Sequence, residues 1–500
     1  MAIAGTTSEG AATGAASGTG NPGYSTAGYR AYILGSLLLV YVFNFIDRAI
    51  LAILNDPIKE SLRLEDWHMG LLGGLAFAML YTTLGIPIAR VAERVNRKWI
   101  IIFSLVLWSA MTVLCGLATS FVMLFVLRIC VGIGEAGCTP PAQSMIADYF
   151  KPSSRATAVS IYALGVPLGA MIAGVAGGWI NDYVTGQGVY AMFGSWGWSW
   201  AQGLVDWQSL EGWRLAFILV GFPGVVLAGI LLLTMKEPPR GYTDPPQAVK
   251  PEPASFSQVM KILWNKPTYV HVVIGASLAA FAGYGIGHFV PAYFVRTHEL
   301  SLSQAAIYYS LILGLCGAIG VFSSGYISDR ISSRHPNALS WLPAIGMATA
   351  VPLYVFGFLQ DVLWLTMPPL MVAALLKYFY LGPMYAVAGG VVDSRMRATS
   401  VAVMLFATNL IGLALGPTVS GLLSSVIKGG ILSASDLELS LEACKVPANL
   451  SAEAVAVCSK ADSTGLQYAI VIFACVYAWA ALHYLLAGRT LQRDMVAKSA

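Results

Sequence analysis

The chain has 500 residues, of which 57% are hydrophobic and only 11% charged, and its mean hydropathy is +0.69. A soluble domain carries about 25% charged residues, so this composition excludes most soluble enzymes and predicts a polytopic membrane protein. The net charge of +4 identifies no partner. We expect the lipid bilayer as the surroundings, no nucleic acid, and a monomer.

Residues 1–28 are rich in Gly, Ala, Ser and Thr and lack the basic and apolar regions of a signal peptide, which predicts a disordered tail. Apolar runs of about 20 residues then mark membrane helices. We expect twelve of them: 31–56, 68–89, 99–118, 121–141, 156–180, 214–234, 269–294, 304–327, 338–358, 362–387, 398–425 and 465–487.

A polar, Pro-rich stretch divides these runs six and six. It predicts a cytoplasmic linker at 235–266, with a short amphipathic helix over 257–266. The expected domains are therefore six-helix bundles at 29–234 and 267–490, followed by a tail at 491–500. Nineteen Lys and Arg residues fall in the loops on the side of the termini and seven in the others. This bias predicts cytoplasmic termini, in the inner membrane if the source is bacterial.

Two loops on the outer side are expected to be long, 181–213 with five Trp and 426–464 with Cys444 and Cys458. In an oxidising space these two thiols can form a disulfide, and two free thiols are the alternative. The seven cysteines show no metal-binding spacing, so no metal is expected.

The two halves repeat each other. An acid–Arg turn carries Glu93, Arg94 and Arg97, and a matching turn 236 residues later carries Asp329 and Arg330. An Arg-Ala-Thr turn recurs 242 residues apart, and an acid precedes each copy; these residues are Asp148 and Arg155 in the first half and Asp393 and Arg397 in the second. The repeat predicts an all-α fold of two pseudo-symmetric bundles.

These turns resemble the GxLADRxGRR signature of the major facilitator superfamily, and Arg128-Ile-Cys-Val-Gly-Ile-Gly-Glu135-Ala resembles its RxxxGxGxA pattern. More narrowly, Asn44-Phe-Ile-Asp47-Arg48 resembles the spinster family, whose animal members export lysophospholipids and sphingosine-1-phosphate. The resemblance implies transport by alternating access, with the charged turns as a latch of the outward-facing state. The alternative is that their basic residues serve only as topology signals.

Four charges lie deep inside the apolar runs of the first half: Asp47, Arg48, Arg128 and Glu135. Each mid-membrane charge costs roughly 2.5–3.5 kcal/mol on insertion scales, so such residues are functional candidates. Arg128 and Glu135 are seven residues apart and share a helix face, about 10 Å apart. We interpret Glu135 and Asp47 as proton sites, Glu135 preferred, and Arg48 and Arg128 as their switching partners or as anchors for an anionic head group. A fixed ion-pair network is the structural alternative.

Lys377 lies opposite Glu135 by the 242-residue repeat. It is expected to bind a phosphate or carboxylate, or else to snorkel or pair with an acid. Further candidates to contact the substrate are aromatic or polar; His288 among them either titrates near neutrality or is only hydrogen-bonded. They are Tyr41, Phe45, Tyr81, Tyr162, Tyr284, His288, Phe379 and Asn409.

No Walker motif or catalytic constellation is present. The expected function is secondary transport of an amphipathic lipid or related organic anion, coupled to protons, with no cofactor beyond the proton gradient. An exporter of hydrophobic drugs or small carboxylates is the alternative within transport. A membrane enzyme and a transporter-like sensor are the alternatives from other classes.

Overall fold

The computed structural model describes residues 26–92, 94–240, 242, 255–332, 334–393, 396–437 and 439–496. Over these residues the protein is helical and has no strand. Twelve helical stretches are long and apolar enough to cross a membrane, and each overlaps one of the twelve predicted runs. The predicted all-α fold of twelve membrane helices is thereby confirmed.

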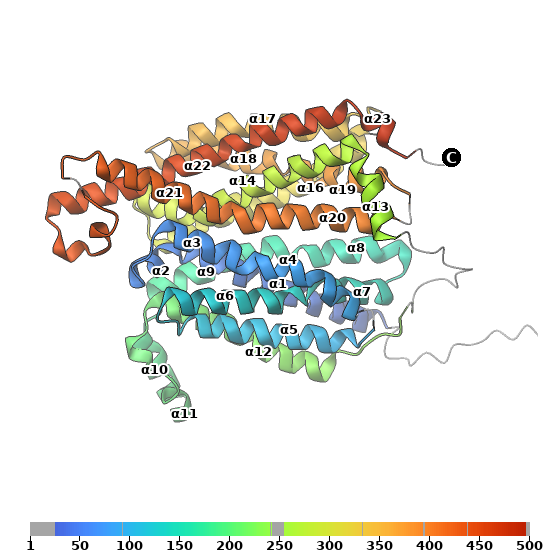
Figure 1. The fold of residues 1–500 in the computed structure, drawn as a ribbon. Helices are drawn as coiled ribbons and strands as arrows, with labels where there is room; N and C mark the ends of the chain where they lie inside the picture. Colours follow the sequence, from blue (N-terminus) through green and yellow to red (C-terminus); the bar gives the residue numbers. More distant parts are fainter. Residues whose placement is uncertain are drawn as a thin grey trace, which may run out of the picture.

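The first half contains the helices that Figure 1 colours blue to green. They are α1 (Ala27–Ile53), α2 (Asn55–Ser61), α3 (Asp66–Gly73), α4 (Leu75–Ala92), α5 (Arg97–Cys115), α6 (Phe121–Ala136), α7 (Thr139–Tyr149), α8 (Pro152–Ala163), α9 (Gly165–Tyr183), α10 (Gly186–Ser195), α11 (Ser199–Gln202), η1 (Trp207–Ser209) and α12 (Gly212–Thr234).

The rest of the chain begins with the linker helix α13 and continues into the second half, where two membrane spans contain a π-helical stretch, η2 and η5. Its elements are α13 (Phe256–Trp264), α14 (Pro267–His298), α15 (Leu302–Tyr309), η2 (Ser310–Cys316), α16 (Gly317–Ser332), α17 (Ala338–Phe358), α18 (Leu363–Lys377), η3 (Tyr378–Tyr380), α19 (Leu381–Gly390), α20 (Arg397–Thr408), η5 (Asn409–Leu415), α21 (Gly416–Ser433), η6 (Ala443–Lys445), η7 (Pro447–Asn449), α22 (Ala452–Gly488) and α23 (Leu491–Asp494).

Each half packs mainly on itself, α1 against α9 and α5 against α12 in the first, α14 and α17 against α22 in the second. One end of the bundle carries α10, α11 and residues 439–451, and we call it the loop end; the opposite end, with α13 and α23, is the termini end (Figure 1). The termini-end helices α7, α8, α19 and α20 pack mainly within their own halves.

The two halves meet toward the loop end, where α3 contacts α21 and α9 contacts α15. Small residues allow this approach. A Cβ on Gly70 would collide with the backbone of Pro417, and one on Gly178 would lie 2.8 Å from the Cα of Ser303. Such glycines let membrane helices pack backbone to backbone. The structure is therefore closed at the loop end.

The loops differ from the prediction at one place. The expected loop 426–464 is mostly helical, because α21 continues to Ser433 and α22 begins at Ala452. Ser451 caps α22 by accepting a hydrogen bond from the backbone N–H of Ala454. The helix therefore starts thirteen residues before the apolar run 465–487, with a polar first part. The loop at 181–213 contains α10, α11 and η1, and the predicted amphipathic linker helix is α13.

Several predicted segments fall partly outside the described residues: the N-terminal tail up to residue 25, linker residues 241 and 243–254, and 497–500. The domain boundaries therefore stay predictions.

Candidate functional site

The charges inside the first half come from α1 and α6. The Nε of Arg48 lies 2.6 Å from the Oε2 of Glu135, forming an ion pair between the two helices. The Glu135 side chain is fully buried and that of Arg48 is 15% exposed. A buried pair of this kind costs heavily when one partner is removed, so α1 and α6 are coupled at this point.

Three aromatic rings surround the guanidinium of Arg48. Its Cζ lies 4.3 Å from the ring centre of Tyr81, 4.9 Å from that of Phe45 and 5.0 Å from that of Phe77. Cation–π attraction at desolvated sites contributes about 2 kcal/mol. Arg48 is therefore held both by a carboxylate and by an aromatic cage.

The other two charges are joined differently from the expected pairing. Arg128 donates from Nη1 to the backbone carbonyl of Asp47 at 3.1 Å and forms no ion pair with a described carboxylate. The Oδ1 of Asp47 and both amide atoms of Asn44 are buried without a hydrogen-bond partner among the described residues. The network thus contains one ion pair, Arg48–Glu135. The Asp47 carboxylate forms no ion pair with a described cation.

Aromatic side chains extend from this network along α1. Tyr41 stacks on Tyr162 of α8 with ring centres 4.4 Å apart, and it meets Phe45 edge-on at 5.1 Å. Phe77 stacks on Tyr81 at 5.3 Å. The predicted contact residues of the first half, Tyr41, Phe45, Tyr81 and Tyr162, are therefore neighbours of one another or of Arg48.

The second half contributes Tyr284 and Lys377. Tyr284 of α14 is 40% exposed. Lys377 ends α18, is 4% exposed, and has its Nζ 4.8 Å from the ring centre of Tyr378. Its ammonium has no ion-pair partner among the described residues, and a Cβ on Gly283 would lie 3.7 Å from it.

Three other predicted contact residues are placed by contacts of their own. The Nε2 of His288 lies 3.0 Å from the carbonyl oxygen of Met69 in the opposite half. Phe379 packs where a Cβ on Gly346 of α17 would stand, and Asn409 begins the π-helical stretch η5. His288 thus serves a contact between the halves in this structure.

The predicted latch residues lie at the termini end. Arg97 pairs with Asp148 of the first half and, at 2.7 Å, with Glu237 at the start of the predicted linker. Arg155 donates to the carbonyl of Ala147 at 2.6 Å.

In the second half, Arg330 donates to the Tyr326 hydroxyl at 3.1 Å. Arg94, Asp393 and Arg397 are exposed. Glu93 and the side chain of Asp329 lie outside the described part of the chain.

A second charged cluster, which no sequence pattern predicts, joins the halves at the loop end. Arg296 of α14 donates to the two carboxylate oxygens of Asp66 at 2.9 Å each and to Asp56 at 3.0 Å. Such paired N–H donors match a carboxylate in geometry and charge. The first half is thereby tied to α14.

Two lysines complete this loop-end network. Lys59 lies 3.0 Å from Asp66 and 2.7 Å from Asp462 of α22. Lys428 of α21 lies 2.9 Å from Asp462 and 3.3 Å from Glu65. Burial acts to lower the pKa of Lys59, but the carboxylates of Asp66 and Asp462 outweigh it and raise the pKa above its usual value. Lys59 is therefore charged at neutral pH.

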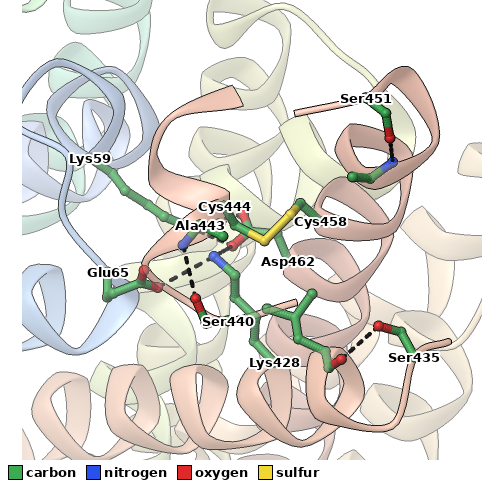
Figure 2. Close-up of a disulfide and its surroundings, with 12 residues drawn as sticks. Lys59, Glu65, Lys428, Ser435, Ser440, Ala443, Cys444, Ser451, Cys458 and Asp462 are labelled. Atoms are coloured by element: carbon green, nitrogen blue, oxygen red, sulfur yellow. Dashed lines mark hydrogen bonds and ion pairs between the residues drawn. A yellow bond between two sulfur atoms is a disulfide. The ribbon is translucent and has the colours of Figure 1, made fainter. Parts of the chain in front are cut away.

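A disulfide between Cys444 and Cys458 lies beside the loop-end network, and Figure 2 shows it next to Lys428 and Asp462. Cys458 and Asp462 are four residues apart on α22 and so share a helix face. The disulfide therefore ties residues 439–451 to the part of α22 that presents Asp462.

Comparisons with known proteins agree with this architecture. The model of the Major Facilitator Superfamily matches residues 37–417. An MFS-type efflux pump of Mycolicibacterium smegmatis is 31% identical over 78% of this chain and 83% of its own length. The human protein spinster homolog 1 is 25% identical over 80% of this chain and 74% of its own.

A solved structure is similar over almost the whole chain. It is the crystal structure of a bacterial homolog of the human lysosomal transporter spinster in an inward-facing, unoccupied conformation. The two chains are 39% identical, the match covers 95% of this chain and 100% of the other, and the TM-score is 0.89.

Proposed function

This chain belongs to the major facilitator superfamily and resembles its spinster members, and we propose that it is a proton-coupled secondary transporter of an amphipathic lipid or a related organic anion. The family and fold are those of transporters, and the protein is a multi-pass membrane protein. The observation that carries the proposal is the buried Arg48–Glu135 pair within an aromatic cage.

Proton coupling follows from the chemistry of this pair. Protonation of Glu135 neutralises the carboxylate and removes the charge that holds Arg48. The released guanidinium is then free to bind an anionic head group. Deprotonation restores the pair and expels the anion, so proton and substrate occupancy are linked.

An amphipathic substrate is supported by the surfaces beside the pair. Tyr41, Phe45 and Tyr162 offer aromatic area for an alkyl chain, and Lys377 offers a second cation from the opposite half. Under alternating access, this site is open toward the termini end while the loop-end network holds the other end closed. The charged turns at Arg94, Asp329 and Arg330 then latch the opposite, outward-facing state, with both termini cytoplasmic.

The test is flux of a lysophospholipid into proteoliposomes with and without a pH gradient. Wild type should accumulate the lipid only when the gradient is present. Glu135→Gln should reduce the gradient-driven flux to that of protein-free liposomes, whereas the matched control Glu60→Gln, an exposed loop-end acid, should transport normally. Gradient-independent flux in both wild type and Glu135→Gln would reject coupling at this residue.

Export of hydrophobic drugs is the second candidate, because a relative 31% identical is an MFS-type efflux pump. The same liposomes loaded with a lipophilic cation distinguish the two. Efflux of the cation without lysophospholipid flux would favour this candidate. Counterflow of unlabelled against labelled lipid separates a transporter from a sensor, which binds without net exchange.

A further inference from the structure

The outer face of the first half carries a groove that has no part in the transport site. It lies between α4, α5 and α6, has a volume of about 550 Å³, and is lined chiefly by apolar residues. Val91, Trp99 and Phe103 on its walls are 50%, 57% and 68% exposed. Since these helices span the membrane and the opposite half lies elsewhere, the groove faces the bilayer.

The groove is about as deep as one leaflet. Its lining runs along α5 from Asn96 to Leu107, which are eleven residues apart. At 1.5 Å per residue this distance is about 16 Å, close to half of the roughly 30 Å hydrocarbon core. The groove therefore extends from the termini-end surface to the middle of the membrane.

Close packing of α5 and α6 forms the deep end of the groove. A Cβ on Gly134 would lie 2.8 Å from the backbone nitrogen of Trp108, so the two helices touch there. Gly134 and Ile133 line the groove, whereas the next residue, Glu135, pairs with Arg48 on α1. Helix α6 thus separates the groove from the transport site.

Positive charges flank the shallow end. Arg94 is exposed and has no ion-pair partner among the described residues. Lys98 is anchored by a 2.8 Å hydrogen bond from its Nζ to the carbonyl of Leu232, and its Nζ lies 6.0 Å from the ring centre of Trp99. A Trp beside basic residues is the usual arrangement at the level of lipid head groups.

We propose that this groove binds one acyl chain of an anionic phospholipid from the leaflet at the termini end, with the lipid phosphate held by Arg94 and Lys98. The apolar lining of the groove favours an acyl chain over a free phosphate ion. The basic rim selects an anionic head group over a zwitterionic one, since each such cation near the membrane surface contributes about fivefold in affinity.

The experiment is native mass spectrometry of the full-length protein released from micelles that contain equal amounts of phosphatidylglycerol and phosphatidylcholine. Wild type should retain one phosphatidylglycerol in preference to phosphatidylcholine. Leu107→Trp, which fills the deep end of the groove, should abolish retention. Val106→Trp, one residue along on the same helix but outside the lining, should retain the lipid as wild type does.

The rim is tested separately with variants on the protein surface. Arg94→Gln with Lys98→Gln should lower the preference for phosphatidylglycerol about twentyfold. The control Arg334→Gln removes an exposed charge from the corresponding turn of the second half and should change nothing. Soluble glycerol phosphate should not displace the bound lipid.

Three results would overturn the proposal. The first is wild type that retains no lipid or both lipids equally. The second is a preference for phosphatidylglycerol that persists in Leu107→Trp, because the charges would then act without the groove. The third is equal loss of the lipid in the rim variant and in Arg334→Gln.

Discussion

The two charged networks differ in which parts of the molecule they connect. The Arg48–Glu135 pair joins two helices of one half, so it is independent of how the halves pack. The loop-end network joins α2 and α3 of the first half to α14, α21 and α22 of the second. It exists only while the halves are in contact at that end. The Arg48–Glu135 pair can therefore take part in binding in every conformation. The loop-end network can stabilise only the conformation that is closed at that end.

The largest effect is expected when the loop-end network loses its central cation. Arg296→Gln leaves the buried carboxylates of Asp56 and Asp66 with less compensation. Removing one partner of a buried pair costs about 3 kcal/mol, and this cost falls only on the closed form. The equilibrium should therefore shift by more than a hundredfold toward forms open at the loop end.

Spin labels report this shift directly. Positions 60 and 436 are exposed, lie at the loop end, and belong to opposite halves. In a variant that keeps the disulfide but lacks the free cysteines, the distance between labels at these sites should lengthen in Arg296→Gln. Arg63→Gln, at an exposed arginine of the same end, is the control. An unchanged distance distribution would show that the network does not hold the loop end closed.

Removing the disulfide tests whether the loop-end network depends on its covalent neighbour. The disulfide closes a segment with a sequence separation of 14, for which the chain-entropy model gives about 3 kcal/mol. Cys444→Ser with Cys458→Ser should therefore speed amide exchange by about a hundredfold over residues 439–464, without affecting α5 or α6. The control is Cys475→Ser, a free exposed thiol. Unchanged exchange would mean that the ion pairs suffice.

The sequence predicts the membrane helices and the four mid-membrane charges of the first half for one physical reason, whereas the specific pairing of Arg48 with Glu135 comes from the structure. The bilayer imposes a length of about 20 apolar residues on each helix, and it makes any charge within that length conspicuous. Both signals are local and need no knowledge of the fold. The partner of Asp47 was not predictable in this way, because Arg128 uses the backbone carbonyl and not the carboxylate.

The loop-end network has no such signal. Lys59 and Asp462 are 403 residues apart, and Lys59, Glu65 and Asp66 lie beside membrane helices, where charged residues are ordinary. The expected loop at 426–464 also concealed the helical extension of α22 that presents Asp462. Hydropathy detects where a chain leaves the membrane but not where its helix ends, so the position of Asp462 required the fold.

The mid-membrane pair should respond to geometry as well as to charge. Arg48→Lys keeps the positive charge but loses the flat guanidinium that three rings surround. With about 2 kcal/mol assigned to the desolvated cation–π contacts, lysophospholipid flux should fall about thirtyfold. Wild-type flux in Arg48→Lys would show that Glu135 needs only a point charge. The pair would then be held by charge alone, as are the loop-end ion pairs of Lys59 and Lys428.

The smallest effect is expected at Lys377, a buried cation that belongs to neither network. Lys377→Met keeps the length of the side chain and removes an ammonium that has no described acid partner. Burying an unpaired charge is unfavourable, so the variant should melt at a higher temperature.

A charged hydrogen bond contributes about 1.5 kcal/mol, so the affinity for an anionic lysolipid should weaken about tenfold in Lys377→Met. The affinity for an uncharged monoacylglycerol should stay the same. Equal weakening for both ligands would remove Lys377 from the head-group site and leave Arg48 as the candidate anchor, because Lys377 would then act through packing.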